Sequence, residues 1–306
     1  MVDEADLPRQ CMGGAGMVGP GMGDDLGVGC RPGEARHGAL RSFHHGDFAL
    51  ADLVAARAGR RVAVCLPARN EAATLGPIVS SVRTTLTGAG GGADLVDDIV
   101  VVDDGSEDGT AAVASRRGAR VITAHTAGGG KGQAMAIALA ETDAELLVFL
   151  DADVENFDPH YVTGLLGPLV FHPSPGQPDV ALVKGFYDRP LHGEKGAGGR
   201  VTELVARPVI DLLFPHLGAV RQPLAGETAA TRTVLDKTGL APGYGVELAL
   251  LIDVAEHFGV EQVAQVDLGV RIHRNRPLTE LRPQATDVLG AALQRAGVRS
   301  ALHPEP

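Results

Sequence analysis

The sequence contains VAVCLPARNE at residues 62–71, DIVVVDDGSEDGT at 98–110 and LLVFLDAD at 146–153. In each segment a short apolar run ends in polar, turn-forming residues. Apolar runs of this length are typical of strands buried on both faces of a parallel sheet. Because ligands of open α/β sheets bind outside the carboxyl ends of the strands, the three polar segments predict one site at one edge of the sheet.

The sequence around these segments alternates between apolar runs and amphipathic stretches. This alternation predicts an α/β fold, in which a mostly parallel sheet is flanked by helices. After residue 184 the alternation weakens, although helices are still expected at about 201–213, 246–258 and 278–296. Strands are expected at residues 62–66, 98–103, 119–123, 146–150, 181–184 and 262–271, with helices beginning near Ala72, Gly109, Gly132 and Pro159.

The composition restricts the possible partners and compartment. The 306 residues are 44% hydrophobic and 21% charged, as expected of a globular protein. The net charge of −11 argues against nucleic acid as a main partner. Three cysteines cannot pair completely, which favours reduced thiols in the cytoplasm. Without an 18-residue apolar run or a charged leader before an apolar run, we expect neither a membrane span nor a secretion signal.

Residues 1–40 mix glycine, methionine and charge without strand or helix periodicity, so we expect a disordered tail. The tail contains GAGMVG at residues 14–19, which formally matches a dinucleotide-binding motif. No predicted strand precedes this match, and Pro20 follows where the helix would run, so we interpret it as chance.

Deleting residues 1–40 is therefore expected to change neither the melting temperature nor turnover by much. The segment shows no apolar periodicity that could offset the entropy cost of ordering it. Thermal unfolding and initial rates of the full and truncated chains measure the effect. A large loss of stability would show that the segment packs against the rest of the chain.

Asp151 and Asp153 directly follow a predicted buried strand. Carboxylates at positions i and i+2 can share a divalent ion, and Mg²⁺ typically takes one or two carboxylates while phosphate oxygens complete its shell. The alternative interpretation is a solvated acidic turn. Their position after the fourth strand favours a metal site for a nucleotide diphosphate.

Asp103 and Asp104 stand at a second strand end. Ser106 and Asp108 are explained by a turn and by capping of the next helix. The Asp104 carboxylate can instead accept hydrogen bonds from a base edge or a ribose.

Lys131 lies in AGGGKG at residues 127–132, where a helix is expected to begin. A cation and free backbone amides at a helix start can bind phosphate. The segment is not a Walker loop, because Gly132 replaces the required serine or threonine. A solvated surface lysine is the alternative.

A second glycine-rich segment, GAGGRVTEL at residues 196–204, opens another helix. Its backbone amides and Arg200 can bind a carboxylate or phosphate, so an acidic acceptor would fit. A flexible loop with an exposed arginine explains the pattern equally well.

The basic segment GVRIHRNRP occupies residues 269–277. His273 can donate a neutral imidazole to a metal, and Arg271 can contact phosphate. A solvated basic turn remains the alternative.

Several segments together resemble one enzyme family over roughly residues 42–295. They are LPARNEA (66–72), VVDDGSEDGT (101–110), GKGQA (130–134), DAD (151–153), VKGFYDRPL (183–191), GGRVTELVARP (198–208), QPLAGE (222–227), APGYGVE (241–247) and LGVRIHRNRPL (268–278). In this order they resemble the glucosyl-3-phosphoglycerate synthase family, which are glycosyltransferases of the GT-A fold, and its mannosyl-3-phosphoglycerate relatives.

This resemblance implies a retaining glycosyltransferase that moves glucose from UDP-glucose to 3-phosphoglycerate with Mg²⁺ or Mn²⁺ as cofactor. It implies a homodimer, a nucleotide-sugar-binding half at residues 41–184 and an acceptor-binding half at 185–306. The alternatives are GDP-mannose as donor, another acceptor, or a binding protein without turnover. A nucleotidylyltransferase would usually carry a glycine-rich loop where this chain has PARNE.

The resemblance also implies roles for individual residues. It implies that Lys131, Asp153 and Glu247 are catalytic and that Asp153 and His273 bind the metal. The residues that it implies for donor binding are Pro67, Ala68, Asn70, Glu71, Asp104, Lys131, Asp151, Ala152, Tyr244 and Arg271. Those that it implies for acceptor binding are Gly199, Arg200, Thr202 and Asn275. The chain departs from the family pattern at Arg69, Asp104 and Asp188, which leaves the choice between UDP-glucose and GDP-mannose open.

Overall fold

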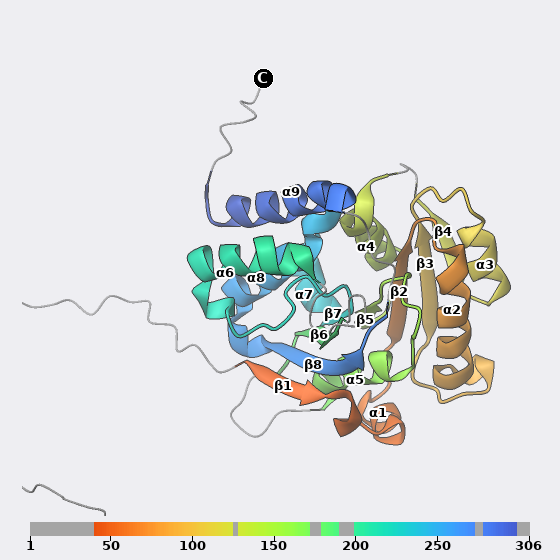
Figure 1. The fold of residues 1–306 in the computed structure, drawn as a ribbon. Helices are drawn as coiled ribbons and strands as arrows, with labels where there is room; N and C mark the ends of the chain where they lie inside the picture. The colour runs from red at the N-terminus through yellow and green to blue at the C-terminus, as the bar shows by residue number, and fades with distance from the viewer. Residues whose placement is uncertain (1–39, 125–127, 172–178, 190–198, 273–277, 299–306) are drawn as a thin grey trace, which may run out of the picture. The chain divides into compact units, whose positions relative to one another are not determined.

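One eight-stranded sheet, in the order β1-β8-β6-β7-β5-β2-β3-β4, organises the described part of the chain (Figure 1). The computed structural model describes residues 40–124, 128–171, 179–189, 199–272 and 278–298, all within the unit His37–Pro306. The strands are β1 (Arg41–His44), β2 (Val62–Ala68), β3 (Asp98–Asp103), β4 (Arg120–Thr123), β5 (Leu146–Phe149), β6 (Leu182–Asp188), β7 (Thr228–Thr231) and β8 (Val263–Val270).

All described strands except β7 run in the same direction. β7 pairs antiparallel with both β5 and β6, whereas the other neighbouring strands pair in parallel. The carboxyl ends of the parallel strands therefore meet at one edge of the sheet, together with the beginning of β7. Residues that follow β2, β3, β5, β6 and β8 are brought to this edge from distant parts of the sequence.

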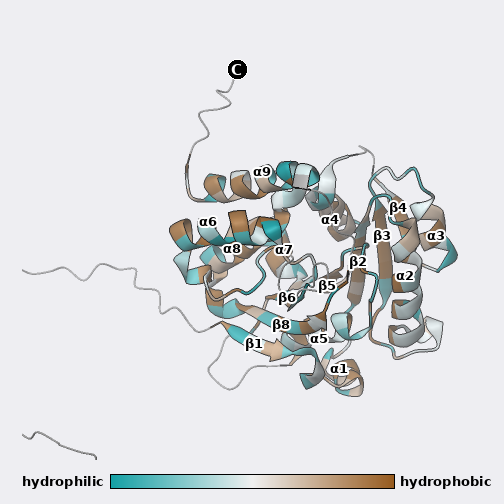
Figure 2. Cartoon of the chain, in the orientation of Figure 1, coloured by the Kyte–Doolittle hydropathy of each residue, from teal (hydrophilic) through white to brown (hydrophobic). Residues whose placement is uncertain are grey.

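Helices cover both faces of the sheet, which explains why its central strands are apolar throughout. Val62, Val64 and Leu66 of β2 belong to the core that includes α2 and α5. Ala63 and Cys65 point to the opposite face and belong to the core that includes α4, α8 and α9. Figure 2 shows β2 and β3 as mostly hydrophobic strands between these layers.

The helices are α1 (Leu50–Ala56), α2 (Ala72–Leu86), α3 (Thr110–Arg116), α4 (Gly130–Ala140), α5 (His160–Val170), α6 (Arg207–Leu213), α7 (Arg232–Thr238), α8 (Val246–Phe258) and α9 (Leu278–Arg295). Shorter turns are η1 (His45–Asp47), η2 (Gly88–Gly90), η4 (Pro215–Leu217), η5 (Gly243–Gly245) and η6 (Val260–Gln262), and η3 (Thr202–Ala206) is a π-helical turn that leads into α6. Among the described residues, no helix combines the length and the apolar character that crossing a membrane would require.

The structure confirms the predicted fold class and every predicted strand, with ends that differ by a few residues. α4 begins at Gly130 rather than near Gly132. Two strands and two helices were not predicted, namely β1, β7, α1 and α7. The sequence of β7 is TAAT, and its two alanines give no strand signal, because alanine is depleted in strands.

Candidate active site

A cavity of about 260 Å³ lies at the edge where the parallel strands end. Most of the residues predicted to form a site line this cavity, although they come from segments as far apart as residues 67 and 271. Those that line it are Pro67, Ala68, Glu71, Asp104, Lys131, Asp151, Ala152, Asp153, Gly199, Arg200, Thr202, Tyr244, Glu247 and Arg271. The structure thus brings them together, and their individual roles stay predictions. The predicted residues His273 and Asn275 lie outside the described residues.

Asn70 is placed differently, because it links two strand-end loops. Its backbone amide donates to Ser106 Oγ (2.9 Å), and its Oδ1 accepts from the amide of Glu107 (2.9 Å). It does not line the described cavity. Asp108 forms the predicted turn contact by accepting from the amide of Thr110 (3.1 Å), whereas Ser106 bonds Asn70 instead of capping the next helix.

Asp104 holds the glycine segment that precedes α4. Its Oδ1 accepts from the amides of Gly128 (2.9 Å) and Gly129 (3.2 Å), and its Oδ2 accepts from the amide of Gly130 (3.2 Å). A carboxylate has about four acceptor positions, so it can make these bonds and still face the cavity that it lines. This structural role was not predicted, because nothing in the sequence places residue 104 beside residues 128–130.

Lys131 lies between two carboxylates. Its Nζ contacts Asp151 Oδ1 and lies 2.6 Å from Glu247 Oε1. Burial alone would lower the pKa of Lys131, but the two carboxylates raise it well above its usual value. Lys131 therefore keeps its positive charge, and the interpretation as a solvated surface lysine is wrong.

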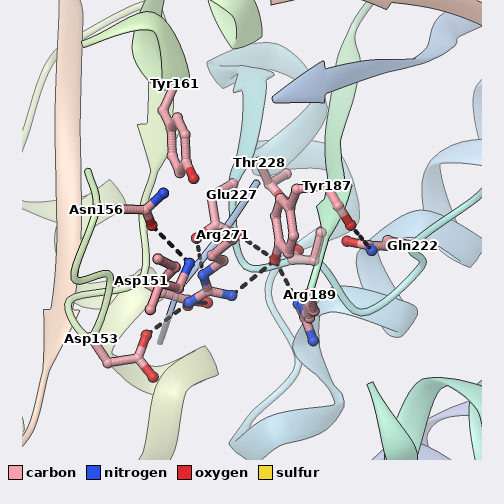
Figure 3. A network of polar contacts seen from close by, with 12 residues as sticks. Asp151, Asp153, Asn156, Tyr161, Tyr187, Arg189, Gln222, Glu227, Thr228 and Arg271 are labelled. Atoms are coloured by element: carbon pink, nitrogen blue, oxygen red, sulfur yellow. Dashed lines mark hydrogen bonds and ion pairs between the residues drawn. The ribbon is translucent and has the colours of Figure 1, made fainter. Parts of the chain in front are cut away.

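Arg271 follows β8 and bridges the two carboxylates of the D-A-D segment. Its Nη2 donates to Asp151 Oδ2 (2.8 Å) and to Asp153 Oδ1 (2.7 Å), as Figure 3 shows. Lys131 and Arg271 hold the pKa of Asp151 well below its usual value although its burial opposes this. The two aspartates are therefore not a solvated acidic turn, since both are paired with the buried Arg271 and Asp151 is also paired with Lys131.

The backbone around Arg271 is held by Asn156, three residues after Asp153. Its Nδ2 donates to the carbonyl of Val270 (2.7 Å), and its Oδ1 accepts from the amide of Ile272 (2.7 Å). Both neighbours of Arg271 are thus fixed to the segment that carries the aspartates. This arrangement keeps the end of β8 beside the end of β5.

The donor set at the D-A-D segment suits a hard divalent cation. Both oxygens of Asp151 are engaged by Lys131 and Arg271, whereas within the described residues Asp153 is paired through Oδ1 alone. The Asp153 side chain is 20% exposed, so its carboxylate remains open toward the cavity. Across the described ranges, no group of three or more histidine, cysteine or acidic side chains forms a complete metal site. The pattern fits an ion held by one carboxylate and by oxygens of a substrate.

The residues predicted for the acceptor begin a helical segment on the cavity wall. Gly199 has a left-handed backbone (φ +84°), and the helical turns after it run through η3 into α6. Arg200 and Thr202 line the cavity, and Thr202 is buried. π-helical turns occur frequently at functional sites, and a helix start attracts anions.

Several residues of the site were not predicted from the sequence. Arg189 lines the cavity from the end of β6, which was predicted to stop at residue 184. Leu281, Gln284 and Val288 reach it from α9. Glu227 lies directly before β7 and behind Arg271, and the failure to predict β7 explains why this carboxylate was overlooked.

Gly226 lies directly against two charged side chains of the site. A Cβ there would overlap Asp151 Oδ1 and Lys131 Nζ. Gly226→Ala is expected to lower turnover by about tenfold or more, because the added methyl group displaces Asp151 and Lys131 from their paired positions, and a loss of about 1.4 kcal/mol of transition-state stabilisation is tenfold in rate. Gly290→Ala in α9 is the matched control, since nothing lies within 4 Å of the added Cβ. Equal initial rates for the two variants would contradict the prediction.

Comparison with known proteins agrees with this geometry. Residues 63–187 match the Glycosyl transferase family 2. The glucosyl-3-phosphoglycerate synthase of Mycolicibacterium smegmatis is 44% identical over 267 residues, which cover 84% of each chain. The enzyme of the same name from Petrotoga mobilis is 40% identical over 268 residues, which cover 83% of this chain and 80% of that one.

Solved structures extend the similarity to the fold. The Mycobacterium tuberculosis glucosyl-3-phosphoglycerate synthase in complex with Mn²⁺, UDP-glucose and phosphoglyceric acid has a TM-score of 0.76 and 42% identity, and the match covers 86% of this chain and 89% of that one. The complex of that enzyme with Mn²⁺, UDP and glucosyl-3-phosphoglycerate also has a TM-score of 0.76, with 41% identity, and the match covers 86% of this chain and 90% of that one. The eight-stranded sheet, the paired aspartates and the helical segment at Gly199–Thr202 all agree with these comparisons, and the chain belongs to the glucosyl-3-phosphoglycerate synthase family.

Proposed function

We propose that this chain transfers glucose from UDP-glucose to 3-phosphoglycerate and forms glucosyl-3-phosphoglycerate with retention at the anomeric carbon. The observation that supports this most strongly is that one cavity contains both the D-A-D segment and the helix start at Gly199–Thr202. The first provides carboxylates for a metal–diphosphate group, and the second provides an anion-binding helix start with Arg200. Relatives at 40–44% identity are named for this reaction.

The donor is proposed to bind at the ends of β2, β3 and β5. Pro67, Ala68 and Glu71 line the cavity after β2, and Asp104 lines it after β3. The half-buried Lys131 and the buried Arg271 lie beside the aspartates, where they can stabilise the charge that grows on a departing diphosphate. Tyr244 and Glu247 are proposed to shape the sugar pocket.

Mg²⁺ or Mn²⁺ is the proposed cofactor, with Asp153 as its ligand among the described residues and His273 as the further ligand that the family resemblance implies. When bound, the ion supplies Lewis-acid stabilisation of the diphosphate leaving group. Asp151 is instead proposed to orient the site, because both of its oxygens bind side chains of the chain itself.

The acceptor is proposed to bind with its anionic groups at Gly199, Arg200 and Thr202, with Asn275 as a further contact implied by the family resemblance. Glu247 is paired with Lys131 at 2.6 Å, so we do not assign it as a nucleophile. The departing phosphate oxygen is proposed to take the proton of the acceptor hydroxyl on the same face of the sugar.

Calorimetric titration in the presence of Mn²⁺ tests the donor. UDP-glucose is expected to bind at least about tenfold more tightly than GDP-mannose, as is achievable when a site makes hydrogen bonds specific to one ligand. Arg69 lines the cavity at a position where this chain departs from the family pattern, so the comparison is informative. Tighter binding of GDP-mannose would instead support the mannosyl-3-phosphoglycerate alternative.

We also propose that two parts of the chain bind different substrates. Residues 41–184 are proposed to form the nucleotide-sugar-binding half and residues 185–306 the acceptor-binding half. The cavity lining supports this, since Pro67–Asp153 contribute the strand ends and Gly199–Thr202 contribute the helix start.

We also propose a homodimer in the cytoplasm. Leu204 in η3 and Leu212 in α6 are 72% and 80% exposed, which supports an apolar contact with a second copy. Light scattering is expected to give twice the chain mass, and a monomer mass would contradict the dimer. The buried free thiol of Cys65 is compatible with a reducing compartment.

A further inference from the structure

Behind Arg271, on the side away from the aspartates, lies a buried tyrosine–glutamate pair. Tyr187 ends in a hydroxyl that accepts from Arg271 Nη1 (2.9 Å) and donates to Glu227 Oε2 (2.7 Å), as Figure 3 shows. The second oxygen of Glu227 lies 3.4 Å from Arg271 Nε. Arg271 and Tyr187 are each 3% exposed, and Glu227 is fully buried.

The pair differs in position from the residues that line the cavity. Neither Tyr187 nor Glu227 is among the described lining residues, whereas Arg271 is. Tyr187 lies in β6 and Glu227 directly precedes the antiparallel strand β7. Both side chains contact the guanidinium of Arg271, and the Tyr187 hydroxyl also accepts from Nη2 of Arg189 (2.5 Å), a second arginine that lines the cavity.

The guanidinium is consequently fixed on two sides. Its Nη2 donates to Asp151 and Asp153, while Nη1 and Nε face Tyr187 and Glu227. Since a guanidinium is planar and its donors have fixed directions, contacts on both sides determine the orientation of the whole group. The orientation of the aspartates toward the cavity then depends on contacts made behind the arginine.

We propose that Tyr187 and Glu227 are positioning residues that hold Arg271 across the two aspartates and so preorganise the diphosphate-binding side of the active site. This inference deepens the proposed function and rests on it. It assigns no substrate contact to either residue.

The charge pattern agrees with this role. Lys131 and Arg271 are in contact with four carboxylates, those of Asp151, Asp153, Glu227 and Glu247. Burial raises the pKa of Glu227, and Arg271 opposes that shift. Burying a carboxylate beside an arginine costs folding free energy unless the carboxylate oxygens are also hydrogen-bonded. The Tyr187 hydroxyl donates to one of the two Glu227 oxygens.

Tyr187→Phe and Glu227→Gln test the proposal with little change of volume. The first removes the hydroxyl that contacts Arg271, Glu227 and Arg189, and the second removes the negative charge that faces Arg271. We expect turnover to fall by about tenfold and the apparent constant for UDP-glucose to rise by about the same factor, because a hydrogen bond to a charged group is lost. The apparent Michaelis constant for 3-phosphoglycerate is expected to stay within about twofold, since neither substitution touches Gly199, Arg200 or Thr202. In the presence of Mn²⁺, UDP is expected to bind the variants more weakly in a titration.

Tyr161→Phe is the matched control. Tyr161 is also a buried tyrosine, and its hydroxyl donates to the backbone carbonyl of Val270 (3.2 Å). That carbonyl also accepts from Asn156 Nδ2 (2.7 Å), so it stays bonded when the Tyr161 hydroxyl is removed. It is expected to leave the constants of both substrates unchanged.

Two results would overturn the proposal. One is a folded Tyr187→Phe variant with the turnover, donor constant and UDP affinity of the parent chain. The other is an equal change in both substrate constants together with a melting temperature far below that of Tyr161→Phe, which would show a purely structural role. Failure of the proposed function is distinguishable, because the unsubstituted chain would then itself show no transfer.

Discussion

Asp153→Ala is expected to abolish transfer while the fold stays intact. The carboxylate is the proposed metal ligand, and within the described residues it is held by a single contact, with Arg271 at 2.7 Å. Lewis-acid stabilisation of a leaving group is worth several kcal/mol, so turnover should fall by at least about a thousandfold. Turnover should fall, and the apparent Michaelis constant for UDP-glucose should rise as well.

Initial rates at saturating Mg²⁺ or Mn²⁺, with circular dichroism to confirm folding, measure this effect. Asp143→Ala is a suitable control, because its side chain is 73% exposed and pairs only with Arg61 among the described residues. This variant should keep the activity of the parent chain. Full activity of the parent chain in excess chelator would refute the metal assignment.

Arg200→Ala is expected to raise the apparent constant for 3-phosphoglycerate by about tenfold to a hundredfold, because a charge-assisted bond to an anion is worth about 1.5–3 kcal/mol. The apparent Michaelis constant for UDP-glucose should be nearly unchanged. Arg200→Lys should restore only part of the affinity, since a point charge cannot reproduce a bidentate contact. Steady-state kinetics with each substrate varied in turn separates the two constants.

Arg207→Ala provides a control in the same helical segment. Its guanidinium donates to the carbonyls of Gly218 (3.3 Å) and Arg221, and it does not line the cavity. The acceptor constant should therefore be unaffected. If Arg200→Ala weakened both substrates equally, or neither, the phosphoglycerate-binding role of this segment would be wrong.

The parts of the fold that could be predicted are those with a strong local signal. β2, β3 and β5 are continuous apolar runs, and each is followed by polar residues that the sheet then brings together. The parallel arrangement was sufficient to predict one site at one edge. Asp151 was recognised for the same reason, whereas Lys131 and Arg200 were recognised because each lies in a glycine-rich segment at a helix start.

The parts that could not be predicted depend on contacts between distant segments. β7 has small side chains and gives no strand signal, so the antiparallel insertion and the buried Glu227 before it were missed. Asp104 was expected to face only a nucleotide, but it also binds amides more than twenty residues away. Arg271 was recognised as basic, whereas its pairing with both aspartates becomes apparent only when β8 and β5 end side by side.

The most direct test of the whole account is a donor-by-acceptor assay with product detection by mass. UDP-glucose, GDP-mannose and two further nucleotide sugars are each incubated with 3-phosphoglycerate or with glycerol in the presence of Mn²⁺. The account predicts one strong product, with the mass of glucosyl-3-phosphoglycerate, from UDP-glucose and 3-phosphoglycerate, and none with glycerol. A hexosyl product from GDP-mannose alone, or transfer to glycerol as readily as to 3-phosphoglycerate, would contradict it.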